Sequence, residues 1–154
     1  LYNNLFNLIK GFPLKVLIAG NFDVIHPGHI YFLTEASKLG EVTVVVARDE
    51  TIKKFKGRAP IFNENERKLI LENLKMIKKV ILGDQKDFFI PVLLEKPDII
   101  FLGPDQYSSW IEERINKSGL GTKIMRLNNR LPYSSSELKR RFLKVYPIDS
   151  TKET

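Results

Sequence analysis

The stretch Gly20-Asn21-Phe22-Asp23-Val24-Ile25-His26-Pro27-Gly28-His29-Ile30 decides how this chain folds. An apolar run, Val16 to Ala19, precedes it, and a segment whose apolar residues recur at helical spacing follows it up to Gly40. This order predicts a buried strand, a glycine turn and the N-terminus of a helix, which presents backbone N–H groups and a positive dipole end to a phosphate. The two histidines of the 154-residue chain, His26 and His29, both lie in this turn.

The remainder of the chain alternates between strand and helix patterns. Apolar and β-branched runs predict further strands at 42–47, 79–82, 98–102 and 123–127. Helices are expected at 63–73, where Asn63 and Glu66 form a capping-box pattern, from Asp87 to about Glu95, at 109–118, and from Ser134 to about 146. Strands that alternate with helices in this way are typical of parallel βαβ units. We therefore expect one doubly wound, Rossmann-like α/β domain with a five-stranded parallel sheet over residues 15–146.

Three segments stand outside this alternation. Residues 1–14 are expected to form an accessory arm, and residues 147–154 a polar tail. The segment Arg48 to Pro60 is long and cationic and shows no period of its own, so we expect a loop there. Loops of this length in compact domains are more often functional than idle.

Composition limits the classes of function. The chain has no cysteine, which excludes disulfides, thiolate catalysis and zinc held by cysteine. No apolar run approaches the roughly 18 to 20 residues that span a bilayer, and no secretory leader is visible, so we expect a cytoplasmic protein without a membrane partner. The net charge of +7 is dispersed apart from clusters at 53–58 and 139–141. Such local clusters favour a small anionic substrate over nucleic acid.

The opening stretch resembles the signature of the HxGH nucleotidyltransferase superfamily, read here as Gly20-x-Phe-Asp-x-x-His-x-Gly-His29. Members of that family join the α-phosphate of a nucleotide to an acceptor phosphate and release pyrophosphate. Arg67, the pair Gly103 and Asp105, and the serine run 134–136 fall where the family has its later nucleotide-contacting elements. The resemblance covers about residues 15–146 and implies both the fold and the reaction.

The residue types suit this chemistry. Charge builds on phosphate oxygens during nucleotidyl transfer, so positioning and electrostatic stabilisation matter more than a nucleophilic side chain. His26 and His29 can donate to phosphate oxygens from one helix end, Gly28 lets phosphates approach the backbone, and Pro27 is tolerated in a first helical turn. By its spacing from His29, the family's phosphate-contacting lysine falls on Lys56.

The resemblance assigns three groups of residues. The catalytic group is His26, His29 and Lys56. The nucleotide-binding group is Gly20, Asn21, Phe22, His26, Pro27, Gly28, His29, Arg67, Gly103, Asp105, Ser134, Ser135 and Ser136. The acceptor-binding group is Asp23, Asp49 and Arg58. No protein metal site is expected, because the resemblance implies that a divalent cation such as Mg²⁺ binds together with the triphosphate.

Among members of the superfamily, the chain is most similar to archaeal-type FAD synthases, which adenylylate FMN with ATP. Phe55, Tyr107 and Trp110 are candidates for stacking on the isoalloxazine ring, and each would serve equally as a core residue. A CTP-dependent glycerol-3-phosphate cytidylyltransferase is the alternative. A nucleotide-binding module without catalysis is a third reading, supported by Asn21 in place of Thr or Ser and by Pro104 in place of a larger residue. A homodimer is possible within the family.

Overall fold

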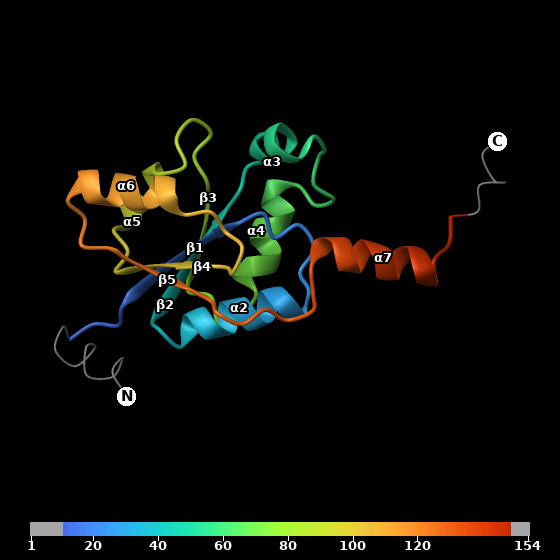
Figure 1. Ribbon diagram of the computed structural model, residues 1–154, viewed down its shortest axis with the longest axis horizontal. Helices are drawn as coiled ribbons and strands as arrows, with labels where there is room; N and C mark the ends of the chain where they lie inside the picture. The colour runs from blue at the N-terminus through green and yellow to red at the C-terminus, as the bar shows by residue number, and fades with distance from the viewer. Residues whose placement is uncertain (1–10, 149–154) are drawn as a thin grey trace.

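A computed structural model describes residues 11–148 of the chain (Figure 1). The expected arm at 1–14 and the expected tail at 147–154 therefore lie mostly outside the described residues. Leu14, at the boundary, is buried and its carbonyl accepts the N–H of Glu41 at 2.8 Å. Among the described residues, the first buried side chain is thus this leucine.

Five parallel strands form one sheet in the order β3-β2-β1-β4-β5. They are β1 (Lys15–Gly20), β2 (Glu41–Val46), β3 (Lys79–Leu82), β4 (Ile99–Leu102) and β5 (Lys123–Arg126). Every predicted strand is confirmed to within one residue at each end. The register places Val16 opposite Val42 on one side and Ile99 on the other. The predicted fold class, a doubly wound α/β domain with a five-stranded parallel sheet, is therefore confirmed.

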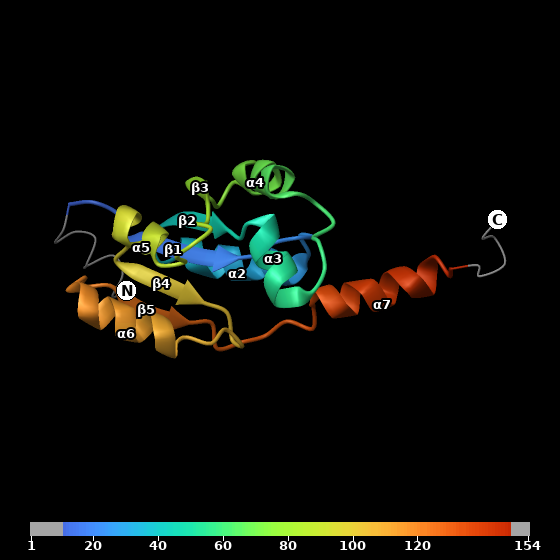
Figure 2. The same cartoon turned by 90° about the horizontal axis from the view of Figure 1, so that it is seen from above.

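Helices cover both faces of the sheet (Figures 1 and 2). On one face, α2 (Pro27–Ser37) and α4 (Glu64–Glu72) bury Leu33, Ala36 and Leu71 against β1 and β2. On the other face, α5 (Ile90–Glu95) and α6 (Ser109–Ser118) contribute to a second apolar cluster that includes Val92 and Ile111. Burial of strands on both faces explains why their sequences are continuous apolar runs rather than alternating ones.

The segment after β2 differs from its prediction. Residues 49–56 form helix α3 (Asp49–Lys56), so the prediction of a loop at 48–60 is wrong over these residues. The helix is stabilised by its charges, with acidic Asp49 and Glu50 in the first turn and lysines in the last, and by Gly57, which ends it at φ +68°. Only Ile52 of this helix is buried, and one buried residue leaves no apolar period to detect.

Two other helices test the predicted starts. Asn63 caps α4, and its capping box with Glu66 is confirmed. The helix predicted to start at Asp87 begins instead at Ile90, because the Asp87 carboxylate accepts the N–H of Phe89 at 2.9 Å in a turn that precedes the helix. Such a turn competes with helix formation at aspartate.

The last helix, α7 (Ser135–Val145), starts where the Ser134 hydroxyl accepts the N–H of Glu137 at 3.1 Å. None of its residues is buried, and Figures 1 and 2 show it projecting away from the sheet. Its first turn nevertheless lies beside the carboxyl end of β1.

The strand order reverses between β1 and β4. The chain leaves β1 towards β2 on one side, and β4 and β5 add to the other side. In open α/β sheets this switch point opens a crevice at the carboxyl ends of the strands, where ligands bind. The histidine turn follows β1 and the Gly103 turn follows β4, so both face this crevice.

Candidate active site

The histidine turn holds its two imidazoles against each other. His26 is the N-cap of α2, and its Nδ1 accepts the backbone N–H of His29 at 3.4 Å. The two rings stack with centroids 3.7 Å apart. Nδ1 of His29 is buried and has no hydrogen-bond partner within the described residues. An unpaired buried nitrogen of this kind is costly unless a ligand or water satisfies it.

Two glycines and one strained residue make this packing possible. Phe22 is buried with φ +48°, a left-handed conformation that a non-glycine residue rarely adopts. A Cβ on Gly20 would lie 2.8 Å from the Phe22 ring, and a Cβ on Gly28 would lie 3.0 Å from the His26 ring. Strain in the backbone concentrates at functional sites, where the surrounding structure holds it in place.

Burial keeps both imidazoles neutral. It lowers the pKa of His26, and it lowers the pKa of His29 to about 4, with the neighbouring His26 adding to the second effect. A neutral imidazole carries one N–H that can donate to a phosphate oxygen. A phosphate anion at this position would favour the protonated form and raise both pKa values.

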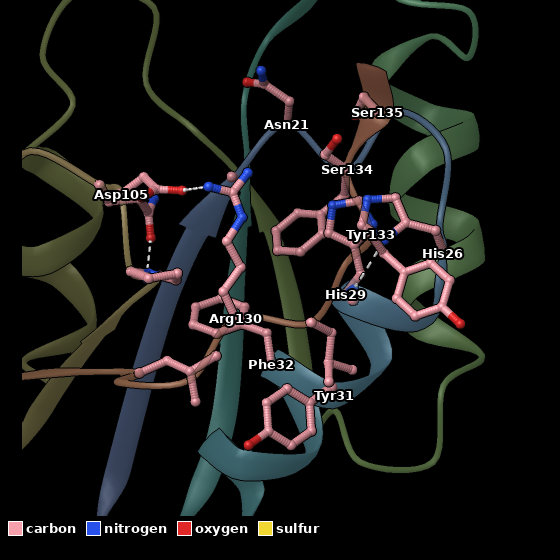
Figure 3. A pocket seen from close by; sticks show the side chains of 18 of the residues that line it. Asn21, His26, His29, Tyr31, Phe32, Asp105, Arg130, Tyr133, Ser134 and Ser135 are labelled. Carbon is pink, nitrogen blue, oxygen red and sulfur yellow. Dashed lines mark hydrogen bonds and ion pairs between the residues drawn. The ribbon is translucent and has the colours of Figure 1, made fainter. Parts of the chain in front are cut away.

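A cavity of about 430 Å³ opens at the switch point, between the histidine turn, the Gly103 turn and the start of α7 (Figure 3). Most residues of the predicted nucleotide-binding group line it. They are Gly20, Asn21, Phe22, His26, Gly28, His29, Gly103, Asp105, Ser134 and Ser135, together with the predicted catalytic Lys56. Residues far apart in the sequence thus meet in one site.

A smaller polar cavity of about 170 Å³ adjoins this one and shares Asn21, Phe22, His29, Lys56 and Ser135 with it. The cations Lys56 and Arg58 lie at its wall, from the end of α3 and the turn that follows. Positive side chains, a helix N-terminus and an imidazole around a small polar space suit phosphate oxygens.

Asp23 fixes the chain beyond α3. Its Oδ1 accepts the backbone N–H groups of Ile61 at 2.8 Å and Phe62 at 3.0 Å, and its Oδ2 lies 3.6 Å from Arg58. The side chain is 12% exposed. Asp23 therefore positions the loop that carries Arg58, and a direct acceptor contact by this carboxylate stays a prediction.

The opposite wall of the main cavity carries an ion pair. Asp105 and Arg130 meet at 2.6 Å, and Figure 3 shows them facing each other across the cavity from the histidines. Both side chains are largely exposed, so either can turn towards a ligand. Arg126 holds the turn in place by donating to the carbonyls of Gly103 and Gln106 at 2.8 and 2.7 Å.

Arg67 differs from the other predicted nucleotide-binding residues because it is fully buried. Its guanidinium donates to the carbonyls of Asn21 at 2.7 Å and Phe62 at 2.9 Å, and to the carboxylate of Asp49 at 2.6 Å. All of these partners are protein groups. Arg67 thus braces the active-site turn from beneath, and it holds Asp49, a predicted acceptor-binding residue, in the same network.

Two further predicted residues, Pro27 and Ser136, lie in the first turns of α2 and α7 and not among the residues that line the main cavity. Sequence reasoning missed Tyr133 and gave Gln106 no role of its own, although both line it. The Tyr133 Cβ lies 3.1 Å from the position that a Cβ on Gly28 would occupy. The position of Gln106 directly after Asp105 was the one sequence feature that could have predicted its place in the cavity. No sequence feature pointed to Tyr133.

The described residues provide no ready protein metal site. Within 11–148, no three His, Asp or Glu side chains gather into a group that could hold an ion. None of the helices in this part of the chain is long and apolar enough to cross a membrane.

Comparison with known proteins identifies relatives over most of the chain. Residues 17–141 match the profile of the family described as Cytidylyltransferase-like. The FAD synthase of Korarchaeum cryptofilum is 44% identical over 138 residues, which covers 86% of this chain and 93% of that protein. The FAD synthase of Picrophilus torridus is 36% identical over 137 residues, covering 86% and 99% of the two chains.

A solved structure agrees with this family. The crystal structure of a protein from Thermoplasma volcanium, described as a lipopolysaccharide core biosynthesis protein, superposes with a TM-score of 0.72 at 42% identity. It covers 77% of this chain and 98% of the other. The fold of this chain thus has close structural precedent.

Proposed function

The chain belongs to the cytidylyltransferase-like family and is a nucleotidyltransferase, and from this premise we propose that it transfers the adenylyl group of ATP to FMN, forming FAD and pyrophosphate. Two relatives described as FAD synthases, which match nearly their whole length, support the choice of substrates. Both relatives share more than a third of their aligned residues with this chain.

One observation carries the proposal: the stacked histidines, the cationic end of α3 and the N-terminus of α7 border one cavity at the switch point. In the proposed reaction a phosphate oxygen of FMN attacks the α-phosphorus of ATP. A new P–O bond forms, and the bond to the bridging oxygen of the β-phosphate breaks as pyrophosphate leaves. Negative charge grows on the α-phosphate oxygens and on the leaving group.

The imidazoles would serve the α-phosphate. The N–H groups of His26 and His29 would donate to its non-bridging oxygens, and the dipole of α2 would add to the stabilisation. Because burial has already desolvated both rings, little further hydration of these donors is lost when a phosphate binds. The FMN phosphate is already ionised near neutral pH, so attack requires no general base.

The leaving pyrophosphate would occupy the polar cavity. Lys56 and Arg58 would pair with its oxygens, and the backbone N–H groups at the start of α7, with the Ser135 hydroxyl, would donate from the other side. A divalent cation, Mg²⁺ by the proposal, would enter on the triphosphate and neutralise part of its charge. The ribose and adenine would lie towards Asp105, whose carboxylate can accept from ribose hydroxyls once Arg130 turns aside.

A direct assay tests this function. Purified protein with Mg²⁺ is given FMN or glycerol 3-phosphate as acceptor and ATP or CTP as donor, and both the nucleotide product and pyrophosphate are quantified. We expect FAD and pyrophosphate in equal amounts from ATP and FMN alone. CDP-glycerol from CTP and glycerol 3-phosphate, without FAD, would establish the alternative transferase. The His29→Ala variant serves as the matched control for contaminating activity.

A further inference from the structure

A second cavity lies on the far side of the β1 terminus and has no assigned ligand. It measures about 260 Å³ and is lined mainly by apolar side chains, with strand residues such as Leu17, Val45 and Ile100 among them. Its lining residues include members of α3, α6 and the loop that follows β3. Figure 1 shows this loop rising between the two helices. This position is still at the carboxyl edge of the sheet.

Four aromatic side chains border this cavity and remain exposed. Phe55 comes from α3, Phe88 from the segment before α5, Tyr107 from the turn after β4, and Trp110 from α6. Their exposed fractions are 66%, 46%, 78% and 38%, in that order. The ring centroids of Phe55 and Phe88 lie 5.9 Å apart. Exposed aromatic rings gathered from four separate segments around one concave apolar surface mark a binding site rather than a core.

The second cavity adjoins the main cavity. The two share Ala19, Gly20 and Gln106. The Gln106 side chain forms the partition, since it donates to the Ala19 carbonyl at 3.1 Å and accepts the Gly103 N–H at 2.6 Å. A ligand in the second cavity that extends a phosphate past the end of β1 would therefore reach the main cavity, where the proposed reaction places the α-phosphate.

Helix α3 faces both spaces with consecutive residues. Phe55 lines the second cavity, whereas Lys56 lines both the main cavity and the small polar cavity beside it. An acceptor with a ring on Phe55 thus has a cation beside its phosphate end. Glycerol 3-phosphate has no ring and would leave the four aromatic side chains unoccupied.

We infer that this aromatic cavity binds the planar ring system of the acceptor, with Phe55, Phe88, Tyr107 and Trp110 in contact with a fused heteroaromatic ring. The inference rests on the proposed function for the identity of the ring, the isoalloxazine of FMN. Its chemical basis is independent, because offset and edge-on contacts with aromatic side chains stabilise planar rings of any such ligand. Thr51 and Asp84, at the same cavity, are suited to the polar edge of the ring.

The fluorescence of Trp110 offers a direct test, because it is the chain's single tryptophan. Riboflavin, which has the ring and no phosphate, is titrated into the wild-type protein and the quenching of tryptophan emission is followed. We expect saturable quenching by riboflavin and by FMN, and none by glycerol 3-phosphate. Absence of saturable quenching by either flavin would overturn the inference.

Substitutions locate the site. Phe55→Ala and Tyr107→Ala should each raise the dissociation constant of riboflavin and the KM for FMN by about 5- to 30-fold, the loss expected for one aromatic contact with its buried area. Phe142→Ala, on α7 and 60% exposed, is the matched control and should change neither. Equal effects of Phe142→Ala, or no effect of the first two variants, would overturn the inference.

The two readouts separate this inference from the proposed function. FAD formation with unchanged KM for FMN in Phe55→Ala and Tyr107→Ala would leave the reaction standing and overturn the ring site. Saturable riboflavin binding that these variants weaken, without FAD formation by the wild type, would support the ring site and remove the proposed reaction.

Discussion

Arg67→Met is the sharpest test of how the active-site turn is held. The resemblance to nucleotidyltransferases implies that Arg67 contacts the nucleotide, whereas the structure shows it fully buried beneath the turn. The two roles differ in what is lost when the charge is removed. If Arg67 is a brace, its loss lowers the stability of the protein even without a ligand. If Arg67 contacts the nucleotide, its loss lowers only the affinity for the nucleotide.

The expected loss follows from the three groups that the guanidinium satisfies. They are the carbonyls of Asn21 and Phe62 and the carboxylate of Asp49. Breaking a buried ion pair costs about 3–5 kcal/mol, and each carbonyl left without a donor costs about 1–3 kcal/mol more. Asp49 is 28% exposed and can regain water, and methionine refills part of the volume. We therefore expect the free energy of unfolding to fall by about 4 kcal/mol, against a usual total of about 5–15 kcal/mol.

Urea unfolding followed by circular dichroism, without nucleotide, measures this change. With a slope of about 2 kcal/mol per molar urea, the midpoint should fall by about 2 M. Lys68→Met is the matched control, because Lys68 is the next residue on α4 and pairs at the surface with Glu72 at 3.4 Å. Its loss should cost about 0.5 kcal/mol or less. An Arg67→Met protein that unfolds at the wild-type urea concentration and has lost ATP affinity would refute the bracing role.

Three further predictions concern the histidine turn. His29→Ala should lower kcat by roughly 10²- to 10³-fold, the usual cost of one preorganised donor to a charged transition state, with unchanged circular dichroism; turnover near wild type would remove His29 from the mechanism. Gly28→Ala should lower kcat/KM by about 10-fold or more, because the new Cβ would lie 3.0 Å from the His26 ring and 3.1 Å from the Tyr133 Cβ. Unchanged kinetics would show that the His26 ring moves aside without loss of activity. Triphosphate binding should take up protons at pH 6, because the pKa of His29 is about 4 in the free protein and the bound anion raises it. Affinity for the triphosphate should then increase as the pH falls through the raised pKa towards 4. Calorimetry in buffers of different ionisation enthalpy measures the proton uptake, and a finding of no uptake would contradict this sign.

The strands and the turn between β1 and α2 could be predicted because their signals are local. A strand buried on both faces reads as a largely apolar run, as in Val42 to Val46. A proline shortly after a glycine turn is favoured at the first position of a helix, so Pro27 indicates where α2 begins. The capping box at Asn63 and the N-cap at Ser134 are also local, since each side-chain oxygen accepts a backbone N–H three positions away.

Arg67 could not be read in the same way. Its neighbours in sequence indicate a polar helix start, and its position in the family's order suggested a ligand contact. Burial depends on where α4 packs, which follows from the sheet order and from the apolar contact of Leu71 with the strands. The partners of the guanidinium are 5, 18 and 46 positions away in the chain, so no local pattern announces them.

Helix α3 shows how a wrong local prediction can leave the site prediction usable. Lys56 was expected in a loop, as the family's phosphate-contacting lysine, whereas it ends helix α3. Glu64 of α4 ties the start of this helix to α4, because its carboxylate accepts from Arg48 at 2.7 Å and from the Asp49 N–H at 2.9 Å. A residue fixed on a helix is already placed before the substrate arrives. In the proposed mechanism, less conformational entropy would then be lost on binding, and the Lys56 cation would contribute more to transition-state stabilisation than it could from a mobile loop.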